Sequence, residues 1–238
     1  MKIQLIRNAT LIVDYADKRF LIDPFLGEKH RYPTFEGAHS DELNPTVELP
    51  MSIEEVIEDI DAVVVTHTHY DHWDEVAIEV LPKNLPILAL SESIATEIRE
   101  QSFTDVRITT GGAFEGIDIT RTTGRHGHGE IAVKAGEVWG IVLRHRDESS
   151  LYIAGDTVYY EEVENILTTE KPDIMVLNAG GNQYLEGGPF VMDMDDLFSC
   201  HQTLPTAKIV SVHMEAINTA KLSRTELKQD IAEKQLTD

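Results

Sequence analysis

The sequence predicts a mixed α/β fold, and three observations support this prediction. Short apolar runs that are typical of strands alternate with segments whose apolar residues recur at helical spacing. Of the 238 residues, 42% are hydrophobic and 26% are charged, which allows a core of ordinary size. Side chains that commonly bind metals follow directly after several of the apolar runs, and active sites of α/β proteins usually lie at such strand ends.

The first part of the chain is rich in predicted strands. Ile3 to Ile6 and Ala9 to Val13 are short apolar runs, and Phe20 to Ile22 returns after a turn at Tyr15 to Lys18. Asp23 then ends the third strand. We expect this aspartate either to accept a hydrogen bond from a metal-binding histidine or to serve as an ordinary turn residue.

Glu28 to Pro50 follows without any hydrophobic period and contains several prolines. A stretch of this length in a compact protein is usually a functional loop, so we expect it to cover the site. We interpret His30 and His39 within it as loop histidines rather than ligands, because no strand positions either of them.

Helices and strands alternate through the rest of the chain. Ser52 and Glu55 form a capping box that starts a helix. A buried strand is expected at Ala62 to Thr66 and a helix at Trp73 to Leu81, while Gly111 and Gly112 indicate a turn. Periodicity predicts further strands over Ile87–Leu90, Val106–Thr109, Ile117–Thr123, Val138–Arg144, Leu151–Ala154, Ile174–Leu177 and Ile209–Val212, and helices over Glu92–Gln101, Glu161–Thr169, Asp193–Gln202 and Ser223–Gln235.

The composition restricts the partners that we expect. The formal net charge is −22 and the isoelectric point is about 4.7. Nucleic acids and anionic membranes need lysine and arginine to neutralise phosphates, so we expect neither as a partner. A small-molecule substrate is expected instead, and it could be anionic if metal ions make the pocket locally positive. A homo-oligomer is left open.

The cysteine content favours a reducing compartment. Cys200 is the single cysteine, so no internal disulfide can form, and it has the setting of a small core residue. Met1 to Phe25 carries charges and has no long apolar centre, which argues against a signal peptide. No stretch reaches the roughly 18 apolar residues of a membrane span. We therefore expect a cytoplasmic protein.

One motif organises the chain: Thr66-His67-Thr68-His69-Tyr70-Asp71-His72, placed between a buried strand and a helix. Histidines two apart on an extended segment point the same way, so His67 and His69 can hold one cation. Asp71 and His72 follow where the chain turns, and they can face a second cation. Imidazoles with a carboxylate suit zinc, iron or manganese.

Three later strand ends carry the same kinds of side chain. The stretch Gly124 to Gly129 contains His126 and His128 between glycines, which permit close backbone approach. His126 is our choice as a ligand because it lies nearer the strand end, and His128 is the alternative. Asp156 follows a strand in Gly155-Asp156-Thr157, and His213 follows the last strand. Taken alone, each of these two residues would be ordinary.

The motif His67-x-His69-x-Asp71-His72 resembles the signature of the metallo-β-lactamase-fold hydrolases. Its form Thr-His-Thr-His-Tyr-Asp-His-Trp-Asp resembles the branch that contains L-ascorbate-6-phosphate lactonase. The resemblance extends over nearly the whole chain. It implies a four-layer αββα sandwich, classed as α/β or by some schemes as α+β, which forms a single domain over residues 1–238 with metals at one edge.

The resemblance also implies roles for these residues. One of two divalent metal ions, zinc first and manganese or iron as alternatives, would bind His67, His69 and His126. The other would bind Asp71, His72 and His213, and Asp156 would lie between them. A metal-activated water would attack a carbonyl or phosphoryl centre, with Asp71 as the catalytic group that orients it and passes on its proton. Asp74 belongs to the motif but is expected in the first helical turn, not as a ligand.

The function expected from this resemblance is metal-dependent hydrolysis of a carboxylic ester or lactone, with a phosphorylated sugar acid lactone as one possibility. The alternatives are a phosphodiesterase or nuclease of the same superfamily and a metal-binding protein without catalysis. The acidic composition argues against a nuclease. Asn182 and Gln183, in a glycine-rich loop, are candidate substrate contacts.

Overall fold

The computed structural model of the protein describes residues 1–234. Its first half consists of β1 (Lys2–Arg7), β2 (Thr10–Tyr15), β3 (Lys18–Ile22), α1 (Ile53–Ile57), β4 (Ala62–Val65), α2 (Glu75–Val80), β5 (Ile87–Ala89), α3 (Glu92–Glu100) and β6 (Val106–Ile108). Its second half consists of β7 (Gly111–Phe114), β8 (Ile117–Thr123), α4 (Gly129–Ala135), β9 (Trp139–His145), β10 (Glu148–Ile153), α5 (Glu161–Glu170), β11 (Ile174–Asn178), α6 (Met194–Thr203), β12 (Lys208–Val212) and α7 (Arg224–Glu233).

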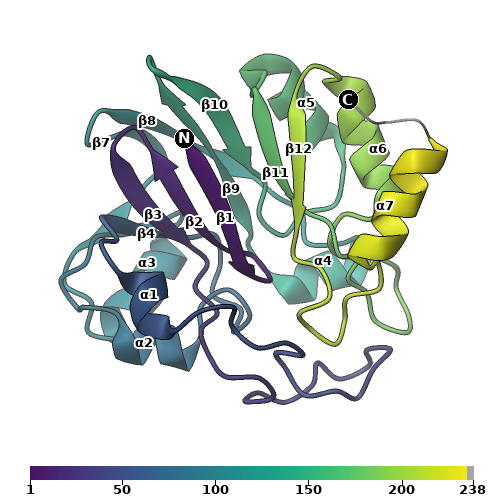
Figure 1. Ribbon diagram of the computed structural model, residues 1–238, viewed down its shortest axis with the longest axis horizontal. Helices are drawn as coiled ribbons and strands as arrows, with labels where there is room; N and C mark the ends of the chain where they lie inside the picture. The colour runs from purple at the N-terminus through teal and green to yellow at the C-terminus, as the bar shows by residue number, and fades with distance from the viewer. Residues whose placement is uncertain (235–238) are drawn as a thin grey trace.

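The strands form two six-stranded sheets, ordered β1-β2-β3-β4-β5-β6 and β12-β11-β10-β9-β8-β7. In the first sheet β1, β2 and β3 pair antiparallel and the remaining strands pair parallel. The second sheet repeats this plan, with β7 to β10 antiparallel and β10 to β12 parallel. Figure 1 shows α1 to α3 beside the first sheet and α5 to α7 beside the second, which confirms the predicted four-layer sandwich.

The core lies largely between the two sheets. One buried cluster joins residues of the first sheet, such as Leu11 and Phe20, to residues of the second, such as Leu143 and Ile153. Every residue of β4 is buried, as expected for a parallel strand that is covered on both faces. A separate cluster packs the second sheet against its own helices. The apolar runs of the sequence are therefore the strands that hold the layers together.

Some predicted elements differ from the structure. Gly111 and Gly112 belong to β7 and not to a turn, because they pair with Thr120 and Ile119 of β8. The helix α4 was not predicted, and none of its residues is buried. Glycines and a short exposed segment carry little periodic signal, which explains both errors. The last predicted helix ended at Gln235, which lies outside the described residues.

Trp73 does not begin a helix, because α2 starts at Glu75. The backbone N–H groups of His72 and Trp73 both donate to the carbonyl oxygen of His69, at 2.9 Å each, and so form a turn. Asp74 then caps the helix: its Oδ1 accepts a hydrogen bond of 2.8 Å from the N–H of Ala77. An aspartate in this position satisfies a donor that the helix leaves free.

Asp74 also connects α2 to the start of the long loop. Its Oδ2 accepts hydrogen bonds from the N–H of Leu26 at 2.9 Å, the N–H of Gly27 at 2.6 Å and the hydroxyl of Tyr32 at 3.0 Å. The side chain is 1% exposed, and burial raises its pKa. One carboxylate therefore fixes where the chain leaves the first sheet and passes over the motif.

The long loop between residues 28 and 50 is held to the second half by two buried amides. The Nδ2 of Asn44 donates to Oδ1 of Asn218 at 2.9 Å, and the N–H of Asn218 donates to Oδ1 of Asn44 at 2.8 Å. Asn218 also donates through Nδ2 to the carbonyl oxygens of Phe35 and Ser40. The ring of Phe35 stacks on Tyr70 of the motif, with 4.6 Å between ring centroids. The loop thus lies where the sequence predicted it.

Within residues 1–234, no helix combines the length and the apolar character that a bilayer span requires.

We predict that Asp74→Ala lowers the free energy of unfolding by about 3 kcal/mol or more, because it leaves several buried donors without an acceptor. Urea unfolding measures this loss. Ser52→Ala is the matched control, since Ser52 caps α1 at the surface and its loss should cost only about 1 kcal/mol. Equal losses in the two variants would show that the contacts to the loop contribute nothing.

Candidate metal centre

The seven residues predicted as ligands lie together at one edge of the sandwich, where strands of both sheets end. His67, His69, Asp71 and His72 follow β4, His126 follows β8, Asp156 follows β10, and His213 follows β12. We call His67, His69 and His126 the first group, and Asp71, His72, Asp156 and His213 the second group. Within each group, one donor atom from every residue lies within 4.8 Å of the others.

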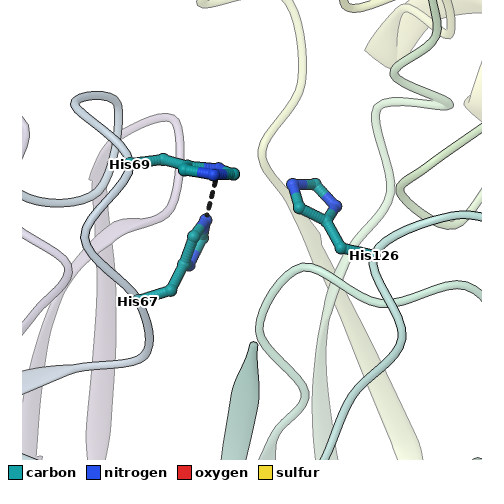
Figure 2. Close-up of side chains that lie close together, drawn as sticks. All are labelled: His67, His69 and His126. Atoms are coloured by element: carbon teal, nitrogen blue, oxygen red, sulfur yellow. Dashed lines mark hydrogen bonds between the residues drawn. The ribbon is translucent and has the colours of Figure 1, made fainter. Parts of the chain in front are cut away.

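The first group consists of three imidazoles from two segments. Figure 2 shows His67 and His69 on one loop and His126 facing them from the opposite side. The Nε2 of His67 is 3.1 Å from Nδ1 of His69. The Nδ1 of His126 contacts the carbonyl oxygen of Phe190 at 2.8 Å, so it carries the hydrogen and leaves Nε2 as a free donor of electrons. Burial lowers the pKa of both His67 and His126, which keeps these rings neutral.

The second group is almost completely buried and contains both carboxylates. The Nε2 of His72 lies 3.1 Å from Nε2 of His213 and 3.2 Å from Oδ2 of Asp156. The Nε2 of His213 lies 3.2 Å from Oδ2 of Asp71. All four residues are at most 3% exposed. Four groups that normally face water or a counter-ion are therefore packed against one another.

Asp156 lies between the two groups. Its Oδ2 is 3.6 Å from Nε2 of His126 and 3.9 Å from Nε2 of His67, in addition to its contacts with the second group. Its other oxygen, Oδ1, accepts a hydrogen bond of 2.6 Å from the side chain of Asn178. The carboxylate thus has one oxygen that is fixed by the protein and one that faces both groups.

The electrostatics of the centre favour positive charge. Burial alone would raise the pKa of Asp71, but the neighbouring His72 and His213 bring it down to about 2. The same balance, with His213 and His72 opposing burial, holds the pKa of Asp156 well below its usual range. Burial lowers the pKa of His72, yet the charges of Asp156, Asp71 and Asp23 outweigh it and raise that pKa well above its usual value.

Asp23 acts as a hydrogen-bond acceptor for a histidine of the centre, which decides between the two roles considered for it. Its Oδ2 accepts from Nδ1 of His72 at 2.9 Å and from the hydroxyl of Thr66 at 2.7 Å, and its Oδ1 accepts from the N–H of Thr66 at 2.8 Å. The Nδ1 of His72 is thereby used, so that Nε2 faces the rest of the second group.

Two asparagines that sequence reasoning missed support the carboxylates. The Nδ2 of Asn8 donates to Oδ2 of Asp71 at 3.1 Å and to its carbonyl oxygen at 3.0 Å. The carbonyl oxygen of Asn8 accepts from the N–H of His213 at 2.8 Å. Asn178 holds Asp156 as described above. The one signal available was position, because Asn8 lies in the tight turn between β1 and β2 with φ of 53° and asparagine tolerates that conformation.

The structure places His126, and not His128, in the cluster. His126 is buried, whereas His128 is exposed at the N-cap of α4 and belongs to neither group. Gly127 between them has φ of 95°, and a Cβ there would lie 2.8 Å from Ile131 and 2.9 Å from Phe190. A glycine is thus required where the chain turns away from the centre. The exposed His30 and His39 lie in neither group, as expected.

A cavity of about 440 Å³ opens over the centre. His69, Asp71, His126, Asp156 and His213 form its floor, and aromatic and aliphatic side chains form its walls. Neither candidate substrate contact lines it, which corrects that prediction. Asn182 is fully buried and donates to the hydroxyl of Thr219 at 3.0 Å. Gln183 faces a different hollow, beside α7. Glycine-rich loops often contact ligands, but the Asn182 side chain holds the loop to Thr219 instead.

The residues present fit divalent cations. The second group brings two ionised carboxylates and two imidazole Nε2 atoms within 4.8 Å in a buried space. A metal ligand must be free of hydrogen at the binding atom, and once His72 gives up the hydrogen on Nε2 this set of electron donors needs a cation as its counter-charge. Nitrogen and oxygen donors of this kind match zinc, manganese and iron. The absence of a cysteine among them fits a catalytic rather than a closed structural site.

Comparison with known proteins gives four results of high similarity. Residues 18–214 match the family described as Beta-lactamase superfamily domain. The UPF0173 protein YddR of Bacillus subtilis is 46% identical over 237 residues, which is 98% of this chain and 93% of that protein. The structure of an isothiocyanate hydrolase from Delia radicum gut bacteria has 41% identity and a TM-score of 0.95, over 99% of this chain and 94% of the other. A possible metal-dependent hydrolase from Veillonella parvula has 37% identity and a TM-score of 0.95, over 98% and 93%.

We predict that His126→Ala strongly reduces the metal content of the purified protein and that His128→Ala leaves it unchanged. The reason is that only His126 faces the other imidazoles. His67→Ala and Asp156→Ala should also reduce it. Atomic emission analysis of protein purified without added metal measures this content. Metal loss in His128→Ala, with full occupancy in His126→Ala, would reverse the assignment.

We predict that Asn8→Gly weakens metal retention about tenfold or more, because partners that orient a ligand commonly have effects of that size. Glycine accepts the positive φ and removes only the side chain. Competition with a chromogenic chelator measures the affinity. The control is Asp17→Gly, because Asp17 lies in another turn and has a φ of 61°. Asn165→Gly would not be a matched control, because Asn165 lies inside α5. Equal metal affinity in all three proteins would contradict a positioning role for Asn8.

Proposed function

The chain belongs to the Beta-lactamase superfamily domain family and to its UPF0173 metal-dependent hydrolases, and on this premise we propose that it hydrolyses a small neutral molecule at an electrophilic carbon. The substrate that we favour is an organic isothiocyanate. The observation that carries this proposal is the likeness of the whole chain, at 41% identity and a TM-score of 0.95, to an isothiocyanate hydrolase. The convergence of seven donor groups on the floor of one cavity supports it.

We assign one divalent cation to the first group and a second to Asp71, His72 and His213, with Asp156 shared between them. Zinc is the metal that we favour, and manganese and iron are alternatives for the same donors. When bound, such cations supply Lewis acidity and lower the pKa of water at the site. Because both sheets provide donors, we infer that residues 1–238 act as one domain. The lone, buried Cys200 is consistent with the cytoplasmic location that we propose.

The chain's own groups orient the reactants. Asp71 lines the cavity and is ionised at neutral pH, so it can accept a hydrogen bond from the attacking water and then receive its proton. Asn8 holds Oδ2 of Asp71 in place, and the Phe190 carbonyl fixes the ring of His126. These restraints exist before a substrate arrives, so little reorganisation is needed during the reaction.

The proposed reaction balances as R–N=C=S plus water giving R–NH2 and O=C=S. The water oxygen bonds to the central carbon while one water proton, passed through Asp71, goes to the nitrogen, which gives R–NH–C(=S)–OH. The second proton then moves from that hydroxyl to the nitrogen, so that both water protons end on the amine. The carbon–nitrogen bond then breaks to release the amine. The reaction needs only water, the substrate, residues of the chain and the cations that these residues would hold.

A carboxylic ester or lactone is the second candidate. Attack on a carbonyl carbon uses the same geometry. Lys134 favours it, because this exposed lysine lines the cavity and, among the ion pairs of residues 1–234, has no carboxylate partner. Its ammonium could neutralise the carboxylate that an ester yields. A phosphorylated sugar lactone, suggested by the lactonase-like form of the motif, is less favoured because a phosphate usually binds several cationic groups.

The walls of the cavity argue against a polymer substrate. The N–H of Leu185 donates to the carbonyl oxygen of Gly37 at 2.7 Å, and Ala38 pairs with Tyr184. The long loop and the loop after β11 therefore join beside the site and form a pocket, which suits a small molecule. A nuclease needs an open basic groove instead.

We predict that the protein converts benzyl isothiocyanate to benzylamine, and that a metal chelator reduces the rate at least about 100-fold until zinc or manganese is restored. Amine release, followed by chromatography, measures this. Phenyl acetate, a simple lactone and bis-p-nitrophenyl phosphate complete the panel, with Asp71→Asn as the inactive reference.

Turnover of the phosphate diester alone would reject both of our candidates. No turnover of any compound by the metal-loaded protein would favour metal binding without catalysis.

A further inference from the structure

We propose that the outer part of the cavity binds a neutral aromatic substituent of the substrate, and that Phe35 is the residue that determines this specificity. The inference rests on the proposed hydrolase function, and it specifies the substituent that the substrate carries next to its reactive group. It is drawn from the shape and chemistry of the walls rather than from the metal centre.

Five apolar or aromatic side chains form much of the wall beyond the donor groups. Phe35, Ile131, Tyr184, Phe190 and Ile217 line this part of the cavity and come from separate segments of the chain. The Tyr184 and Phe190 rings lie 4.9 Å apart between centroids. Phe190 in turn meets His126 edge to face at 5.2 Å. An aromatic surface therefore begins directly beside the first group, where it can contact the substituent that an isothiocyanate carries on its nitrogen.

Phe35 is fixed in this wall without any ligand. Its ring stacks on Tyr70 with planes only 11° apart. Its backbone N–H donates to Oδ1 of Asn218 at 3.1 Å, and its carbonyl oxygen accepts from Nδ2 of the same side chain. Asn218 is 3% exposed and pairs reciprocally with the fully buried Asn44. The face of Phe35 is thus preorganised, and binding a ring against it requires little ordering.

The charges around the opening favour a neutral substituent. Glu36, Glu186 and Lys134 line the same cavity, so two carboxylates stand against one ammonium. The chain as a whole carries −22. A carboxylate or phosphate on the outer part of a substrate would meet net repulsion there, whereas an uncharged ring would gain contact with three aromatic side chains.

The test compares matched substrates that differ only in the substituent: benzyl against methyl isothiocyanate, and benzyl against methyl acetate. The ratio of kcat/KM values within each pair cancels the chemistry of the electrophile. We expect Phe35→Ala to lower the benzyl-to-methyl ratio about tenfold, a size typical of losing one large apolar contact in a specificity pocket. Phe35→Leu should lower it less, because it keeps part of the surface and preserves the fold if the alanine variant is unstable.

Phe198→Ala is the matched control, because Phe198 is also half-buried but lies on α6 outside the cavity. Its ratio should equal that of the unchanged protein. A 4-carboxybenzyl analogue should react at least about tenfold more slowly than the benzyl compound, and added salt should reduce that difference because it screens charge. The metal content of every variant is measured to verify that the centre is intact.

The outcomes separate the inference from the function on which it rests. If no substrate of either pair is hydrolysed by the metal-loaded protein, the proposed function fails. In that case, calorimetry measures the affinity of the unchanged protein and of Phe35→Ala for benzyl alcohol. If Phe35→Ala binds benzyl alcohol as tightly as the unchanged protein does, the inference is wrong. If substrates are hydrolysed but both Phe35 variants keep the original ratio with full metal content, the proposed function stands and the aromatic specificity is wrong.

Discussion

The constraint on which the structure depends is the burial of like and unlike charges in one place. Asp71 and Asp156 lie almost without solvent contact, and His72 and His213 are packed between them. Their attraction holds the carboxylates ionised, yet it leaves several electron-donating atoms facing each other. Only a rigid frame can maintain such an arrangement, because a flexible one would relax to let water in. The frame consists of four strand ends and the neutral hydrogen-bonding groups beside them.

Both halves of the chain contribute to this frame, and their sheets have the same arrangement of strands. Each sheet changes from antiparallel to parallel strands along its order. The donors come from β4 in the first sheet and from β8, β10 and β12 in the second, so neither sheet has a complete set. The apolar core between the sheets sets the distance across which they meet. Packing between the sheets therefore controls the geometry of the centre. Hydrogen bonds from the amides of Asn8 and Asn178 then orient the carboxylates of the centre.

Much of this was readable from the sequence, and the failures have physical causes. Continuous apolar runs such as Ala62 to Val65 are typical of buried strands, and this one is β4. Histidines and aspartates directly after such runs were therefore easy to place at one edge. β7, α4 and the start of α2 were not, because their positions depend on pairing and capping contacts rather than on periodicity. The asparagines Asn8, Asn44 and Asn218 were missed for the same reason: an amide reveals its role only through distant partners.

The support of the cavity walls differs from the support of its floor. The donors stand on strand ends that the core immobilises, whereas Phe35, Tyr184 and Glu186 stand on loops that meet through a few backbone hydrogen bonds. The side chains of Phe35, Tyr184 and Glu186 make no hydrogen bond to the donors, although the carbonyl oxygen of Phe190, in the same loop as Tyr184, contacts His126. Substitutions at these three side chains would therefore change the shape and charge of the cavity walls, while the metal-type ligands keep their positions on the strand ends.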